Sequence, residues 1–239
     1  MRAAWILITA VLMLAGCSQQ AVPAEKAPPV DLRSTPQPGL NYVAVIGDSF
    51  TAGSPAGGAK SSPANWVNRV STELRGRGVD IRASVGAIGG TGYASAGRKA
   101  TSGLFSEQVR QVVGYNDNLV VLFGSRNDSQ IDPALLAPKV HDTLTQVRKL
   151  APNAKILMVG PVWTNATPTL AVQANRDVLK AQAAEFGATF VDPLAEKWFW
   201  DRPDLLGPDG VHPTDAGHGY IAERMTPVIE HLLAPPPTG

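Results

Sequence analysis

The run Leu119-Val120-Val121-Leu122-Phe123 is continuously apolar and is followed at once by Gly124. A strand with one face in water alternates apolar and polar residues, whereas a strand covered by helices on both faces stays apolar throughout. The run is also short for a helix, and it ends at a glycine, which favours a buried strand. We therefore expect residues 119–123 to form a central strand of a parallel sheet.

Similar runs lie on both sides of this segment and alternate with stretches of helical periodicity. The expected strands span residues 42–46, 79–85, 119–123, 155–159 and 189–191. The expected helices span residues 63–76, 133–150, 170–186 and 214–233. In the last helix we expect Thr214 to be the N-cap and Pro227 to cause a kink or an early end. The alternation predicts an α/β fold, a three-layer α/β/α sandwich with a mostly parallel sheet of about five strands.

Three polar segments lie where such a sheet binds its ligands, beyond the carboxyl ends of the strands. Gly47-Asp48-Ser49 follows the first strand, residues 124–128 follow the third, and residues 209–212 precede the last helix. A serine in such a turn can expose its hydroxyl, and Asn127 of the second segment can donate its side-chain N–H to a developing oxyanion. Each segment alone is also compatible with a structural role, as a helix cap or an Asx turn.

Asp209 and His212 are three positions apart in a segment that is pinned by glycine and prolines. One tight turn would place the carboxylate against one ring nitrogen and leave the other nitrogen free to act as a general base. The alternative is a loop that only caps the final helix. The remaining histidines, His141, His218 and His231, fall in helical stretches, and we interpret them as surface or core residues.

The order of the three segments resembles the block pattern of the SGNH/GDSL hydrolase family, over roughly residues 40–233. The family's asparagine block usually reads Gly-x-Asn-Asp, and this chain has one extra residue between Gly124 and Asn127. The resemblance implies that Ser49 is a nucleophile, that His212 is its general base, and that Asp209 orients the imidazole. It also implies the α/β/α sandwich already predicted from the strand and helix pattern, in its flavodoxin-like form.

The resemblance further implies an oxyanion hole built from the Ser49 N–H, the Asn127 side chain and the backbone N–H of a glycine. That glycine belongs to a block after the second strand, where this chain reads residues 84–92 without the usual leading asparagine. Gly89 and Gly90 are both candidates, and the spacing does not settle which one serves. A glycine suits this role because a backbone N–H can then approach the reacting carbonyl closely.

The N-terminus predicts export and a lipid anchor. A short positive start and the apolar residues 3–15 lead into Leu14-Ala15-Gly16-Cys17, which resembles the lipobox of bacterial lipoproteins. Cys17 is the only cysteine in the chain and therefore has no disulfide partner, which favours lipid attachment. The alternative is an ordinary secretory signal that happens to contain a cysteine. We expect a signal peptide at 1–16, a lipidated Cys17 with a proline-rich tether to residue 39, the hydrolase domain at 40–233 and a structureless tail at 234–239.

Other classes of function find little support. The formal net charge is +1, without the basic footprint of a nucleic-acid binder. The glycine-rich residues 53–61 and 86–92 miss the spacing of nucleotide-binding loops, and no cluster has metal-ligand spacing. We therefore expect neither a metal nor a cofactor.

The sequence predicts a monomeric serine esterase, anchored on the extracytoplasmic side of the cell membrane. Its expected substrate is a carboxylic ester, with a small acyl group or an envelope lipid, cleaved through an acyl-enzyme. Two alternatives stay open. One is an acyltransferase that uses the same triad, and the other is a non-catalytic envelope lipoprotein.

Overall fold

The computed structural model describes residues 36–53, 64–97, 103–124 and 126–235. The expected signal peptide, Cys17 and all of the tether up to residue 35 lie outside the described residues, as do residues 236–239 of the expected tail. In the described part, the first strand begins at Leu40 and the last helix ends at Leu233.

The centre of the fold is a five-stranded sheet with the order β2-β1-β3-β4-β5, in which every neighbouring pair is parallel. The strands are β1 (Leu40–Gly47), β2 (Asp80–Ala87), β3 (Leu119–Phe123), β4 (Lys155–Val159) and β5 (Thr189–Val191). All five residues of β3 are buried, which agrees with its unbroken apolar sequence. The predicted α/β class and its parallel sheet of about five strands are confirmed.

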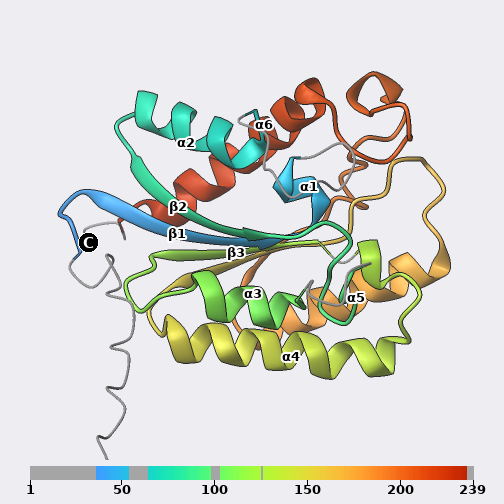
Figure 1. The fold of residues 1–239 in the computed structure, drawn as a ribbon, viewed down its shortest axis with the longest axis horizontal. Helices are drawn as coiled ribbons and strands as arrows, with labels where there is room; N and C mark the ends of the chain where they lie inside the picture. Colours follow the sequence, from blue (N-terminus) through green and yellow to red (C-terminus); the bar gives the residue numbers. More distant parts are fainter. Residues whose placement is uncertain (1–35, 54–63, 98–102, 125, 236–239) are drawn as a thin grey trace, which may run out of the picture. The chain divides into compact units, whose positions relative to one another are not determined.

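Helices cover both faces of the sheet (Figure 1). One face packs against α2 (Trp66–Gly76) and α6 (Asp215–Leu233), and the other against α3 (Phe105–Val112), α4 (Pro133–Leu150) and α5 (Leu170–Glu185). Successive strand residues point to opposite faces, so Val43 and Val45 join the first core while Ala44 and Ile46 join the second. Within the described residues, no helix is both long enough and apolar enough to cross a membrane.

Apart from the short helix α1 (Ser49–Ala52) and differences of a few residues in element bounds, the structure departs from the predicted elements in α3 and in α6. Helix α3 was not expected from the sequence, because it has only eight residues and its buried side includes the polar Gln108. Helix α6 begins after its N-cap Thr214 as predicted, but the expected early end at Pro227 is wrong, since the helix continues to Leu233. Met225 and Ile229 are buried on either side of the proline, and their packing holds the helix on the sheet despite the missing N–H.

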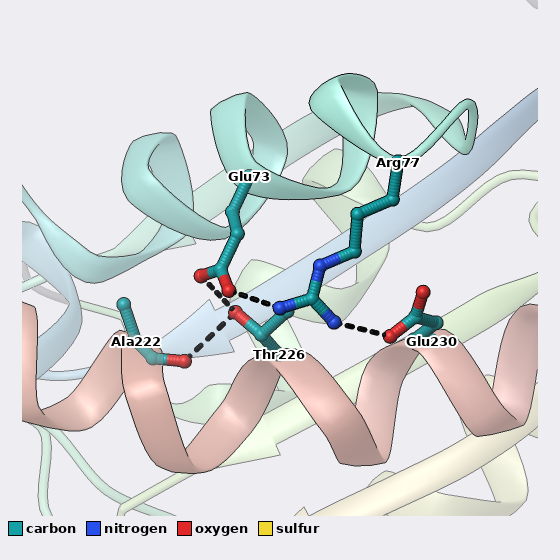
Figure 2. A network of polar contacts seen from close by, with 5 residues as sticks. All are labelled: Glu73, Arg77, Ala222, Thr226 and Glu230. Carbon is teal, nitrogen blue, oxygen red and sulfur yellow. Dashed lines mark hydrogen bonds and ion pairs between the residues drawn. The ribbon is translucent and has the colours of Figure 1, made fainter.

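Polar contacts join α2 to α6, the helix that follows the Asp209–His212 segment (Figure 2). Arg77, just after α2, donates from Nη1 to Glu230 of α6 at 2.6 Å, and its Nη2 pairs with Glu73 of α2. The Thr226 hydroxyl of α6 lies 2.9 Å from both Glu73 Oε2 and the Ala222 carbonyl oxygen. These contacts, over a shared apolar core, set the position of α6.

One buried group on α6 should make the stability of the fold sensitive to acid. The His218 side chain is 2% exposed, and burial lowers its pKa from 6.5 to about 4. Between these two values the unfolded chain binds a proton that the folded chain does not, so stability falls as the pH falls through this range.

We predict that His218→Gln reduces this acid-induced loss by up to about 3 kcal/mol, because glutamine takes up no proton. The measurement is urea unfolding at pH 7 and at pH 4, with the change between the two pH values compared across variants. His231→Gln, on the exposed part of the same helix, is the control and should follow the unmodified chain. Equal acid losses in all three proteins would contradict the prediction.

Candidate active site

Ser49 lies directly beyond the carboxyl end of β1, as the first residue of the short helix α1 (Ser49–Ala52). The residue that caps this helix is Asp48, whose Oδ1 accepts a hydrogen bond from the Phe50 N–H at 2.9 Å. At Gly47 an added Cβ would overlap the Thr51 side chain, so the sharp entry to this turn needs glycine. The capping role that the sequence left open for this segment therefore belongs to Asp48, and the Ser49 hydroxyl is available to a different partner.

That partner is His212. Its Nε2 lies 3.0 Å from Ser49 Oγ, and its Nδ1 lies 2.6 Å from Asp209 Oδ2. A proton on Nδ1 directed at the carboxylate leaves the Nε2 lone pair facing the serine hydroxyl, which is the orientation required of a general base. The structure thus brings Ser49, His212 and Asp209 into one hydrogen-bonded chain.

The segment from Asp209 to His212 is a tight turn held by its own carboxylate. Asp209 Oδ1 accepts from the backbone N–H groups of Val211, at 2.9 Å, and His212, at 3.0 Å. The hydrogen bond from the His212 ring, supported by these N–H groups, holds the pKa of Asp209 well below its usual range. The Thr164 hydroxyl also donates to the Gly210 carbonyl oxygen at 2.9 Å, which anchors the turn to the loop after β4.

Aromatic side chains of the core pack near the His212 ring. The Phe50 ring lies 6.4 Å from the His212 ring and 6.2 Å from Phe199, which has a positive φ of 62°. Trp198 and Phe199 are fully buried in the core, so they pack the fold and do not line a binding surface. Bulky residues adopt a positive φ only where packing holds them, as it does here.

Asn127 lies just beyond β3, in the 3-10 turn Arg126–Asp128. Its Nδ2 donates to Asp48 Oδ2 at 3.1 Å and to the Thr91 carbonyl oxygen at 2.8 Å. Both hydrogens of this amide are therefore engaged within the protein, and a substrate oxygen would have to replace one of the two acceptors. Burial raises the pKa of Asp48 to about 7, an effect that the hydrogen bond from Phe50 opposes.

Gly89 and Gly90 form the centre of a turn beside Asn127. The Thr91 N–H closes this turn on the Ile88 carbonyl oxygen at 3.3 Å, and that bond uses neither glycine N–H. Gly90 has a φ of 79°, so the turn itself requires glycine at this position. The structure leaves both N–H groups as candidates for the oxyanion hole.

Asp128 is the last residue of the asparagine block, and the sequence pattern predicts no role for it. Its buried carboxylate accepts from the backbone N–H groups of Tyr93 and Ala94, both at 3.0 Å. Burial raises its pKa, and these hydrogen bonds act against that shift. Asp128 thereby holds the loop after Gly90 against Asn127. The Ser95 hydroxyl of this loop also donates to the backbone carbonyl oxygen of Asn127 at 2.8 Å. The one signal in the sequence was the presence of an acidic residue next to Asn127. It could not identify the partners of Asp128, because these lie some 35 positions away in the chain.

Comparison with known proteins decides the family of this chain. Residues 45–220 match the model of the GDSL-like lipase/acylhydrolase family. The chain belongs to this family. The resemblance inferred from the sequence blocks is therefore confirmed, and the GDSL-like family is one of ester hydrolases.

Individual relatives agree with this assignment. The chain is 47% identical over 197 residues to the GDSL lipase Rv0518 of Mycobacterium tuberculosis, which covers 81% of this chain and 84% of the relative. The fold is similar to that of TesA, with a TM-score of 0.64 and 22% identity over 81% of this chain and 100% of TesA. It is also similar to the lipase/acylhydrolase of Enterococcus faecalis, with a TM-score of 0.64 and 16% identity over 83% of this chain and 100% of that one.

The loop that Asp128 holds offers a test of how tightly the site is packed. At Gly92 an added Cβ would overlap the Asp128 carboxylate, whereas at Gly76 of α2 it would meet nothing within 4 Å. We predict that Gly92→Ala lowers the free energy of unfolding by about 1–3 kcal/mol through this overlap. Gly76→Ala, the matched control, should be neutral or slightly stabilising. Urea unfolding of both variants checks this, and equal stabilities would refute the packing argument.

Proposed function

We propose that the protein is a serine esterase that hydrolyses carboxylic esters, with Ser49 as nucleophile, His212 as general base and Asp209 as the group that orients the imidazole. The observation that carries the proposal is the hydrogen-bonded chain from Asp209 through His212 to Ser49, with distances of 2.6 and 3.0 Å. This chain stands at the carboxyl edge of the sheet, where α/β folds bind their ligands.

In the proposed reaction, His212 Nε2 takes the proton of the Ser49 hydroxyl as Oγ attacks the ester carbonyl carbon. The resulting imidazolium is stabilised by the Asp209 carboxylate and then gives the proton to the leaving alcohol, so that an acyl-enzyme remains. Water then attacks the acyl-enzyme while His212 Nε2 takes one of its protons. The imidazolium returns this proton to Ser49 Oγ as the bond from Oγ to the acyl carbon breaks, which releases the carboxylic acid and restores the serine hydroxyl.

The oxyanion of each tetrahedral intermediate would be held by the Ser49 N–H, by the N–H of Gly89 or Gly90, and by Asn127. Donors fixed before the reaction stabilise this charge without reorganisation, and one such donor typically contributes about 3–4 kcal/mol. The hydrogen bond from Asn127 Nδ2 to the Thr91 carbonyl oxygen supports this arrangement, because Thr91 directly follows the two glycines.

We further propose that the enzyme works on the extracytoplasmic side of the cell membrane, held by a lipidated Cys17. The support is the segment 14–17 and the proline-rich residues that follow it. An anchored enzyme meets lipid esters and acylated glycans, and the 47%-identical relative is named a lipase. A small acyl ester or a lipid ester is therefore the proposed substrate.

The first test is ester hydrolysis by the purified full-length protein and by Ser49→Ala. We expect release of p-nitrophenol from p-nitrophenyl acetate to octanoate, and a loss of at least about 10³-fold in kcat for the variant, since the nucleophile is removed. If no chain length gives release that depends on Ser49, the esterase proposal fails. Release that is accelerated by added alcohols or sugars would favour an acyltransferase instead.

A second test addresses the orienting carboxylate. In Asp209→Asn the amide oxygen can still accept the Val211 and His212 N–H groups, so the turn should persist. Its NH₂ group, however, donates where the carboxylate accepted, which disfavours the tautomer with a proton on Nδ1. We predict a fall in kcat on the order of 10³-fold with little change in KM. A variant with normal kcat would show that Asp209 does not orient the base.

A further inference from the structure

Arg126 is in the segment where this chain has one residue more than the usual Gly-x-Asn-Asp pattern, and it directly precedes Asn127. Its guanidinium carbon lies 4.3 Å from the centroid of the Trp163 ring, and its Nη1 approaches the Val162 carbonyl oxygen at 3.4 Å. Stacking in this way fixes the plane of the guanidinium, and its N–H groups point outward from the edge of that plane, where they can still donate.

Arg126 differs from the other described arginines that lie over aromatic rings. Arg224 lies over Tyr220 but pairs with Glu196 at 3.5 Å, and Arg202 lies over the same ring but pairs with Asp204 at 2.8 Å. In the part of the chain that the structure describes, no carboxylate lies within 4.0 Å of the Arg126 guanidinium. To the described residues its side chain donates one hydrogen bond, which at 3.4 Å is long and uses one of five N–H groups.

The surroundings make this unpaired cation unusual. Burial lowers the pKa of Arg126, and the negative charges of Asp48 and Asp209 oppose that shift. A guanidinium nevertheless stays charged at neutral pH, and a partly buried charge is unfavourable until a counter-charge meets it. Asp48 and Asp209 act on Arg126 from a distance and do not pair with it directly, so among the described residues its N–H groups have no carboxylate in contact and can take up an anionic group.

Arg126 also belongs to the edge of the sheet that carries the triad. Its electrostatic partners are Asp48, the neighbour of Ser49, and Asp209, the partner of His212. The loop that supplies its stacking ring is tied to the Asp209–His212 turn by the hydrogen bond from Thr164 to Gly210. The charge of Arg126 therefore acts on residues next to both Ser49 and His212.

We propose that Arg126 is a specificity-determining residue that binds an anionic group, a carboxylate or a phosphate, carried by the ester substrate. The inference rests on the proposed esterase function and names its substrate class, which is anionic carboxylic esters. Two parallel N–H···O bonds from the guanidinium edge would hold either anion, with Trp163 fixing the plane of the guanidinium. Hydrolysis itself proceeds as described above, and the anionic group takes no part in bond making.

The anionic group could lie in the alcohol part or in the acyl part of the ester, and two pairs of substrates separate these cases. For the alcohol part, 1-acylglycerol 3-phosphate is compared with the 1-monoacylglycerol of the same chain length. For the acyl part, mono-p-nitrophenyl adipate is compared with p-nitrophenyl hexanoate. Within each pair the ester bond is the same and only the distant charge differs.

The quantity to measure is the ratio of kcat/KM for the anionic ester to kcat/KM for its neutral counterpart, in full-length protein. We expect the unmodified enzyme to favour the anionic member of at least one pair. In Arg126→Gln that ratio should fall about tenfold or more, mainly through KM, because a charge-assisted hydrogen bond is lost. Arg126→Lys, which keeps the charge but not the planar fork, should give an intermediate ratio.

Arg224→Gln is the matched control, since it removes a stacked arginine that has its own carboxylate partner, and its ratio should be unchanged. A variant that still cleaves the neutral ester is folded, so the ratio does not depend on the yield of active protein. The inference is overturned if neither pair shows a preference for the anionic ester, or if Arg126→Gln keeps the ratio of the unmodified enzyme. In both cases Ser49-dependent cleavage of neutral esters would leave the esterase proposal standing. If no ester of either kind is cleaved in a Ser49-dependent way, both proposals fall.

Discussion

Gly47 of β1 lies opposite Phe123 of β3 in the parallel register of the sheet, so these two strands end side by side. They are also the pair at which the strand order reverses, because β2 lies on one side of them and β4 and β5 lie on the other. At such a point the chain leaves neighbouring strands toward opposite faces and opens a crevice at the edge. Ser49 and Asn127 each follow one of the two strands, and the geometry of the site depends on this pairing.

The third part of the site arrives from the end of the chain. His212 and Asp209 sit in a turn just before α6, and the ion pairs of Figure 2, together with the core between the helices, hold α6 against α2. The site therefore combines two strand ends fixed by backbone pairing with one loop fixed by side-chain packing. A small shift of α6 would change the 3.0 Å contact between His212 and Ser49 directly.

The sequence predicted what depends on local pattern. The unbroken run 119–123 predicted β3 with its observed bounds, and the turn residues around Asp209 and His212 predicted a carboxylate placed against an imidazole. It did not predict contacts that join distant segments, such as those of Asp128 with Tyr93 and Ala94. The sequence did not predict helix α3 for a related reason. Its buried Gln108 breaks the apolar periodicity, and the partner of that polar group, Thr91, lies in another segment of the chain.

The engaged amide of Asn127 has a consequence for how such a site would distinguish states of the substrate. Above pH 7, where Asp48 is ionised, a neutral ester carbonyl is a weaker acceptor than the Asp48 carboxylate, so in the ground state it would compete poorly for the Nδ2 hydrogen. Once the carbonyl oxygen has become an oxyanion, it carries a full negative charge and is as strong an acceptor for this hydrogen as the Asp48 carboxylate. In the proposed mechanism the hydrogen bond from Asn127 would therefore form chiefly as the tetrahedral intermediate develops. Binding energy that appears only at this stage raises kcat and does not increase the affinity for the unreacted ester.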